Sequence, residues 1–331
     1  NVSVIPDIQE LQLNIEAIEK GGYEHFMLKE INEQPRSIRD TMRGRLLVDE
    51  GVIKMAGIWD HQEKFLKAKR IIIVPVEVEY ASEFRYRNPI IKKGDVVIAI
   101  SQSGETADTL AALKLAKEKG AFIFGINNVV GSSIARMTDA GAYTHAGPEI
   151  GITTNKKNTA QLTILALIAM KLGKHNGELS TEKFHYLTRE LDHIPELVEK
   201  ILQNCEGVID RIAEKYKDNK NAIYLGRGYN YPSALEGALK LKEISYIHAE
   251  GYPAAEMKHG PIALLDENMP VIVIATKKGY YEKVVSNVQE IKSRSAKVIA
   301  IVNEGDEQVT ALADDFVVIP ETAEEFSPIL A

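Results

Sequence analysis

The chain has 331 residues, of which 45% are hydrophobic, and a formal net charge of −7 at pH 7. This length suffices for two domains of ordinary size. No apolar run approaches the roughly 18 residues of a membrane helix and no secretory signal is evident, so we expect a cytoplasmic protein without a membrane partner. The acidic balance argues against nucleic acid as a partner. The single Cys205 excludes a disulfide framework.

Helical patterns come first along the chain. The runs 8–20, 23–34 and 37–46 predict helices, and Pro35 is expected to end the second of them. Further on, short β-rich runs alternate with helical ones, which predicts an α/β fold with parallel sheets flanked by helices. The alternation comprises RIIIV (70–74), EVEYASEF (77–84), DVVIAI (95–100), ADTLAALKLAKEKG (107–120), AFIFGIN (121–127) and AGAYTHA (140–146).

The second half of the chain repeats this pattern. SQSG (101–104) aligns with TKKG (276–279), and the same spacing pairs AFIFGIN (121–127) with AKVIAIV (296–302). A repeat this regular predicts two copies of one α/β domain. We therefore expect an N-terminal helical segment (1–45), a first domain (46–175), linking helices (176–215) and a second domain (216–331).

The repeat is interrupted in the first copy after Val74. The second copy follows its opening strand with GRGYNYPSALEGALKLKEISY (226–246), a glycine-rich turn and a helix, whereas RIIIV of the first copy runs directly into PVEVEY (75–80). Parallel strands need a crossover of about a dozen residues. We therefore expect that a strand-to-helix segment of roughly 20 residues is missing after Val74.

A polar loop, SQSGET (101–106), follows the apolar run 95–100. One interpretation is structural, with Ser103 capping the next helix. The other is an anion site, in which Gly104 lets backbone N–H groups approach a phosphate and the hydroxyls add donors. The second copy has TKKGYY (276–281) at this place, and a structural cap would be needed in both copies. Divergence at the carboxyl end of a strand therefore favours a binding function.

The second copy has its own group of titratable residues. Glu236, Lys240 and Glu243 are spaced to share one helical face, where a solvated salt-bridge network is the ordinary interpretation. A loop rich in glycine and proline follows, and titratable groups beside a charged helix face suit proton transfer. Each histidine on that loop could equally be a packing residue. No metal-ligand spacing is present, so no metal or cofactor is expected. The loop carries His248, Glu250, Glu256 and His259.

Six stretches together carry a family resemblance. They are HFMLKEINEQP (25–35), SEFRYR (82–87), SQSGET (101–106), AGPEIG (146–151), YPSALEGALKLKEISYIHAE (231–250) and KHGPIALLD (258–266). They resemble glucosamine-6-phosphate synthase and, more narrowly, its isomerase half, a tandem pair of sugar-isomerase (SIS) domains. The resemblance covers nearly the whole chain, and the fifth and sixth stretches are far more specific than the SQSGET loop.

The resemblance implies the first step of hexosamine synthesis, in which fructose 6-phosphate and ammonia give glucosamine 6-phosphate. The ammonia would come from glutamine in an N-terminal glutaminase domain, and the enzyme would be a homodimer without a cofactor. The sugar phosphate would be bound by Ser101, Gln102, Ser103 and Thr106, with further contacts from Ile152 and Thr154 and a supporting role for Gly104.

The resemblance also assigns catalytic roles. Lys240 would form an imine with the ketose, and Glu243 would move the proton between C1 and C2. His259, donated by the neighbouring subunit, would open the sugar ring. Glu236 and Glu256 would support these groups.

The sequence departs from the family pattern at several places. ITTNKKNTAQ (152–161) stands where the family reads close to VASTKAFTAQ, so Asn155, Lys157 and Asn158 put sugar contacts from this stretch in doubt. No glutaminase domain is present, and the chain stops at Ala331 before the family's closing helix and tail. We therefore expect the full synthase activity to be absent from this chain.

Two other functions fit part of the pattern. Another SIS isomerase or sugar-phosphate deaminase would share the phosphate loop but not the ammonia step, and the long match over 235–250 argues against it. A non-catalytic module that senses a sugar phosphate would keep SQSGET (101–106). It would have no need of Lys240, Glu243 and His259 together.

Overall fold

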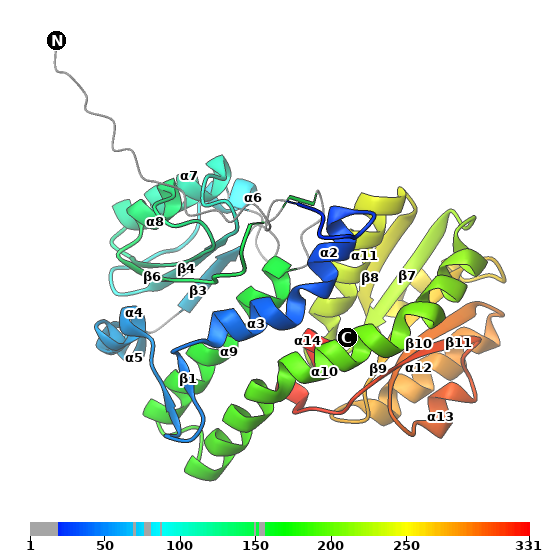
Figure 1. Cartoon of the computed structure of the whole chain (residues 1–331). Coiled ribbons are helices and arrows are strands. Elements are labelled where there is room, and N and C mark those ends of the chain that lie inside the picture. Colours follow the sequence, from blue (N-terminus) through cyan, green and yellow to red (C-terminus); the bar gives the residue numbers. More distant parts are fainter. Residues whose placement is uncertain (1–18, 69–70, 76–80, 87, 149, 152–155) are drawn as a thin grey trace.

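The architecture consists of two α/β lobes. They lie on either side of the long helices α9 (Lys156–His175) and α10 (Thr181–Tyr216) (Figure 1). The predicted fold class, parallel sheets flanked by helices in two SIS-like units, is confirmed. The computed structural model describes residues 19–68, 71–75, 81–86, 88–148, 150–151 and 156–331.

The first lobe and the segment before it alternate short helices with strands. The elements are α2 (Phe26–Asn32), α3 (Gln34–Met42), β1 (Leu46–Leu47), β2 (Val52–Ile53), α4 (Ala56–Trp59), α5 (Gln62–Lys67), β3 (Ile71–Pro75), α6 (Ala81–Tyr86), β4 (Val96–Ser101), α7 (Ala107–Glu118), β5 (Phe122–Asn127), α8 (Ser133–Met137) and β6 (Ala140–Tyr143).

The second lobe follows α10. Its elements are β7 (Asn221–Gly226), η1 (Gly228–Asn230), α11 (Tyr231–Ser245), β8 (His248–Pro253), η2 (Glu256–His259), η3 (Pro261–Leu264), β9 (Pro270–Ala275), α12 (Tyr281–Ser293), β10 (Lys297–Asn303), α13 (Glu307–Thr310), β11 (Asp315–Ile319), η4 (Glu324–Phe326) and α14 (Ser327–Leu330).

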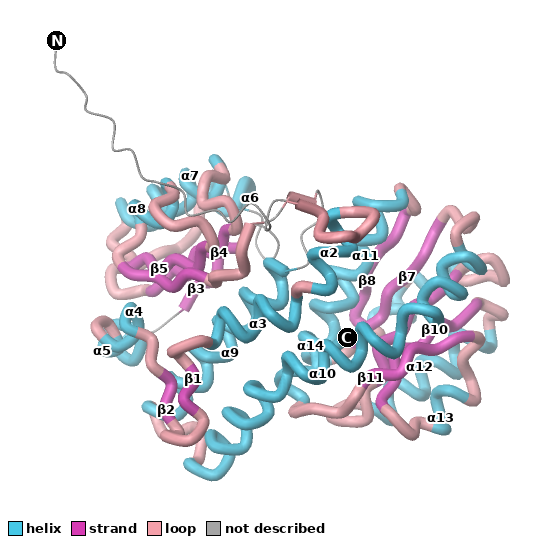
Figure 2. The backbone as a smooth tube through the Cα atoms, viewed as in Figure 1, coloured by secondary structure: helices cyan, strands magenta, loops and turns pink. Residues whose placement is uncertain are grey.

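Both main sheets are parallel, and Figure 2 shows them as two separate groups of strands. The first has the strand order β3-β4-β5-β6 and the second the order β11-β10-β9-β7-β8. Every residue of β4 and β5 is buried, as expected for central strands covered by helices on both faces. Because the strands are parallel, their carboxyl ends share one edge in each sheet, and loops at that edge can form a binding site.

In the described residues, the second lobe has one strand and one helix more than the first lobe. In the second lobe, α11 and β8 follow the opening strand β7, and β8 forms the edge of the sheet. Within the described part of the first lobe, the opening strand β3 is followed by α6, and nothing corresponds to α11 or β8. Ile71 and Ile73 of the edge strand β3 are partly exposed.

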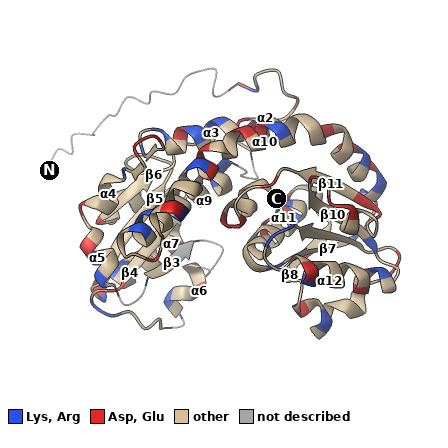
Figure 3. Cartoon of the chain, turned by 90° about the horizontal axis from the view of Figure 1, so that it is seen from below, with Lys and Arg blue, Asp and Glu red and all other residues tan. Residues whose placement is uncertain are grey.

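The helices between the lobes join them into one core. The predicted linking region forms the single helix α10, which packs on α3, α9 and α14. Leu191 and Ile194 of α10 belong to a buried cluster that also contains Phe326 and Ile329 from the end of the chain. Basic and acidic residues are interspersed along α3 and α10 in the view of Figure 3. Among the described residues, no helix has the length and apolar character that crossing a membrane requires.

Four local predictions need comment. Pro35 lies in the first turn of α3 and does not simply end a helix, because proline is well tolerated where no intrahelical N–H bond is lost. The predicted loop after α11 is wrong in part, because His248–Pro253 forms β8, paired with β7. ASEF, taken as part of a β-rich run, begins α6. Nearly all of the predicted helix at 8–20 lies outside the described residues.

Candidate active site

The loop 101–106 connects the end of β4 to α7. The Oγ atom of Ser101 accepts the N–H of Gly104 at 3.0 Å, and the Oγ atom of Ser103 accepts the N–H of Glu105 at 3.2 Å. A serine hydroxyl that accepts such a bond keeps its own proton. Both hydroxyls can therefore still donate to a ligand.

The loop hydroxyls do not cap the following helix. Thr106 occupies the N-cap of α7 and makes no side-chain capping bond, so the capping interpretation of Ser103 is wrong. The first backbone N–H groups of a helix have no intrahelical partner and carry its positive dipole end. Gly104 has a φ of 68°, and a Cβ there would overlap the side chain of Ser132, the N-cap of α8. The tight turn therefore presents donors at the start of α7.

Three buried oxygen atoms around this loop have no hydrogen-bond partner among the residues that the structure describes. They are Gln102 Oε1, Thr109 Oγ1 on α7 and Asn127 Oδ1 at the end of β5. Buried polar atoms are normally paired, so unpaired ones at a strand end point to a ligand or to loop movement. The sequence analysis missed Thr109 and Asn127. A signal was available for Asn127, because asparagine ends the equivalent strand of both copies, at Asn127 and Asn303.

Lys240 lies between two carboxylates on α11. Its Nζ atom is 3.2 Å from Glu236 Oε1 and 3.1 Å from Glu243 Oε2. The Lys240 and Glu236 side chains are 16% and 19% exposed, so this pair differs from the solvated salt bridge of the ordinary interpretation. Burial lowers the pKa of Lys240, but the two carboxylates raise it more, and the net shift of the pKa is upward.

A cavity of about 250 Å³ lies beside Lys240. Its wall comes from five helical elements and includes Gln34 of α3, Asn158 of α9, Leu202 of α10, Glu236 of α11 and residues 328–331. The cavity therefore opens between the lobes and not within one sheet. Asn158, one of the residues foreign to the family pattern, faces the same space as Lys240.

Comparison with known families and structures identifies this architecture. The SIS domain family matches residues 62–171 and 215–331. The chain belongs to the SIS family. The C-terminal domain of glucosamine-fructose-6-phosphate aminotransferase from Francisella tularensis has a solved structure that is 37% identical, with a TM-score of 0.86, and the match covers 94% of this chain and 93% of that one.

Two curated relatives show which members of the SIS family this chain resembles. Both carry the name glutamine–fructose-6-phosphate aminotransferase (isomerizing). The protein from Chlorobaculum tepidum is 54% identical and that from Bacteroides thetaiotaomicron 52%, over all of this chain. The chain spans 57% of the length of each relative. The resemblance to the isomerase half of this synthase is therefore confirmed.

Apart from Glu236, none of the other predicted site residues that the structure describes lines the Lys240 cavity. His259 and Glu256 belong to η2 and are exposed, and neither is among the residues that line the Lys240 cavity. The Nε2 atom of His248 lies 3.4 Å from Glu250 Oε1 on β8. No residue of the SQSGET loop lines the Lys240 cavity either. Ile152 and Thr154 lie outside the described residues. Among those described, no cluster of histidine, cysteine or acidic residues could hold a metal ion.

Proposed function

We propose that this chain performs the isomerase reaction of glucosamine 6-phosphate synthesis. Fructose 6-phosphate and ammonia would give glucosamine 6-phosphate and water, with ammonia supplied from glutamine by a glutaminase domain. The observation that carries the proposal is the Glu236–Lys240–Glu243 cluster beside a cavity. The proposed route through an imine needs a nitrogen nucleophile and a carboxylate base close together. A sensor of sugar phosphate needs neither.

The proposed steps use this cluster directly. The neutral amine of Lys240 attacks C2 of the open-chain ketose, and water leaves to form a ketimine. Ammonia then displaces Lys240 at C2. Glu243 takes a proton from C1 and returns one to C2, which leaves an aldehyde at C1 and an amine at C2. His259 would open the ring before these steps, and Glu236 and Glu256 would orient the reacting groups.

The SQSGET loop would bind the phosphate. Ser101, Gln102, Ser103 and Thr106 would contact its oxygens together with the N–H groups at the start of α7, and Gly104 keeps the backbone close enough. Ile152 and Thr154 would contact the sugar. This binding energy, remote from C1 and C2, would orient the substrate for proton transfer.

The proposal is tested by isotope exchange. Fructose 6-phosphate is incubated with the chain in D₂O, and loss of the C1 proton is followed by ¹H NMR. We expect exchange above the protein-free rate without any nitrogen donor, because Lys240 can form the ketimine itself. A chain that binds fructose 6-phosphate but exchanges no C1 proton would instead support the sensor function.

Replacing Thr106 with valine is expected to weaken fructose 6-phosphate binding by about 1–3 kcal/mol, because one hydrogen bond to a charged group is lost with little change in shape. Isothermal titration calorimetry measures this change. Thr310→Val is the matched control, because the Thr310 hydroxyl bonds only within its own helix turn. Equal dissociation constants for Thr106→Val and the unmodified chain would remove Thr106 from the phosphate site.

We also propose a homodimer in which His259 serves the site of the neighbouring subunit. His259 is exposed and is not among the residues that line the Lys240 cavity, and both observations support this arrangement. Mixing Glu243→Gln with His259→Ala chains is then expected to restore part of the C1 exchange that each lacks alone, because hybrid dimers contain one intact site. Mixed dimers that form but show no recovery would assign His259 to its own subunit or to no catalytic role.

We propose further that the first SIS domain lacks one helix–strand unit directly after Val74. Among the described residues, the first sheet has four strands and the second has five. The alignment with the Chlorobaculum tepidum relative extends over 352 positions for a chain of 331 residues, which leaves about 21 positions of the relative without a counterpart. A natural chain with a larger intact mass than this sequence would support the proposal, and an equal mass would exclude it.

A further inference from the structure

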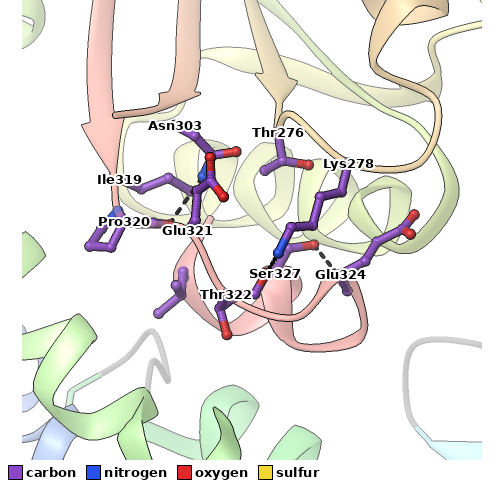
Figure 4. A pocket seen from close by; sticks show the side chains of 10 residues that line it. Thr276, Lys278, Asn303, Ile319, Pro320, Glu321, Thr322, Glu324 and Ser327 are labelled. Carbon is purple, nitrogen blue, oxygen red and sulfur yellow. Dashed lines mark hydrogen bonds between the residues drawn. The ribbon is translucent and has the colours of Figure 1, made fainter. Parts of the chain in front are cut away.

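The loop of the second SIS domain that corresponds to SQSGET is filled by the chain itself. The Nζ atom of Lys278 donates to the carbonyl of Thr322 at 2.6 Å, and the Nδ2 atom of Asn303 donates to the carbonyl of Pro320 at 3.1 Å. The side chain of Glu324 lies against Gly279. Only about 10 Å³ of free volume is left among these groups (Figure 4). The place of an anionic ligand in the first copy is therefore taken by residues 320–327, which we call the strap.

A buried polar network fastens the strap to the helix that carries Lys240. Asn230 is the N-cap residue of α11, and its Nδ2 atom donates to Thr276 Oγ1 at 2.8 Å. Its Oδ1 atom accepts the hydroxyl of Ser327 at 2.9 Å. Asn230, Thr276 and Ser327 are 5%, 8% and 5% exposed. Such a buried network specifies one arrangement, because each broken bond leaves an unsatisfied polar group.

The residues that follow the strap form one wall of the Lys240 cavity. The Ser233 hydroxyl of α11 donates to the carbonyl of Pro328 at 3.3 Å. Ile329 and Leu330 are buried in the core shared with α10 and also line the cavity. The strap thus leads from the second loop to the wall that faces Lys240. Its position is set on one side by Asn230 and on the other by apolar packing.

We propose that Asn230 is a positioning residue, which holds the strap against α11 and thereby keeps residues 328–331 closed over the Lys240 cavity. In the second SIS domain, the strap thus occupies the place that the phosphate would take beside the SQSGET loop of the first domain. Thr276 accepts a hydrogen bond from Asn230, and Lys278 donates one to the carbonyl of Thr322. Both bonds therefore help to hold the strap and, through it, the wall of the Lys240 cavity. The catalytic consequence rests on the proposed function, but the closure of the cavity does not.

The test measures closure without any sugar. The rate of acetylation of Lys240 by acetic anhydride is followed by peptide mass spectrometry, with the exposed Lys67 as internal reference, and amide hydrogen exchange is followed over 320–331. In Asn230→Ala we expect both rates to rise by roughly tenfold, because loss of a buried hydrogen-bonding side chain shifts a local opening equilibrium by about that factor.

Two variants serve as controls. Asn230→Asp keeps both bonds, since the Thr276 hydroxyl can donate to a carboxylate, so its rates should stay within about twofold of the unmodified chain. Lys277→Met should also leave them unchanged, because the Lys277 ammonium bonds to the Glu304 carbonyl and not to the strap. Should Asn230→Ala fail to fold, Ser327→Ala removes one bond of the same network and should change both rates in the same direction.

The outcomes separate this inference from the proposed function. Faster hydrogen exchange over 320–331 with unchanged acetylation of Lys240 would overturn the inference, and so would two unchanged rates. Faster acetylation in Lys277→Met would also overturn it, because the effect would then not depend on the strap bonds. Failure of the isotope exchange in the unmodified chain would reject the proposed function and leave the closure of the cavity standing.

Discussion

Replacing Lys240 with methionine is expected to abolish covalent capture of fructose 6-phosphate on this chain. In the unmodified chain, borohydride reduction of the ketimine should add one sugar phosphate to the intact mass. Methionine fills similar space but has no amine, so no imine forms. The C1 exchange in D₂O should fall to the protein-free rate for the same reason. Both losses are complete because no other lysine shares the Glu236–Glu243 environment within the described cavity.

The pH dependence of this capture follows from the raised pKa of Lys240. Only the neutral amine attacks a carbonyl, so capture should accelerate as the pH rises toward that raised pKa. Glu236→Gln removes one of the two carboxylates that raise the pKa, and it should therefore accelerate capture at neutral pH. Glu243→Gln should act likewise on capture while slowing C1 exchange by about 10²–10⁴-fold, because it removes the proposed base.

The control is Lys242→Met, which removes an exposed lysine from the same helix without touching the cavity. It should leave both capture and exchange unchanged. Capture that persists in Lys240→Met, or that disappears in Lys242→Met, would assign the imine to another residue. Equal loss in both variants would indicate damage to α11 and not the chemistry of one amine.

Gly104→Ala is expected to damage both stability and phosphate binding. Its φ of 68° costs a residue with a Cβ about 1–2 kcal/mol. The new Cβ would also displace Ser132, whose Oγ accepts the Ala135 N–H as the cap of α8, for about 1 kcal/mol more. The free energy of unfolding in urea should fall by the sum. The dissociation constant of fructose 6-phosphate should rise by roughly tenfold or more, because the loop N–H groups move away from the phosphate.

Gly94→Ala separates the two contributions. Gly94 also has a positive φ, of 94°, but a Cβ there would contact nothing within 4 Å. It should show the backbone cost alone and leave sugar-phosphate affinity unchanged. If Gly104→Ala matched Gly94→Ala in both measurements, the contact with Ser132 would have no role in the loop.

Much of the fold can be read from the sequence because its signals are local or periodic. Alternating strand and helix patterns predict parallel sheets, and the regular spacing of the repeat predicts two domains. The spacing of Glu236, Lys240 and Glu243 predicts one helical face, which α11 has. The errors are local as well. The stretch 248–253 was misjudged because glycine and proline tolerate more than one context, and its pairing as β8 with β7 decides its structure.

The sequence alone thus determined the fold class, the two SIS units and the shared helical face of Glu236, Lys240 and Glu243, because each follows from a local or regularly repeated pattern. Only the tertiary structure decided what surrounds them. The Lys240 cavity joins α9, α10, α11 and residues 328–331, and the bonds of Asn230 reach 46 and 97 residues along the chain. The unpaired oxygen of Asn127 is equally invisible to periodicity. Such contacts are fixed by how separate elements pack, and no local pattern of residue types encodes that packing.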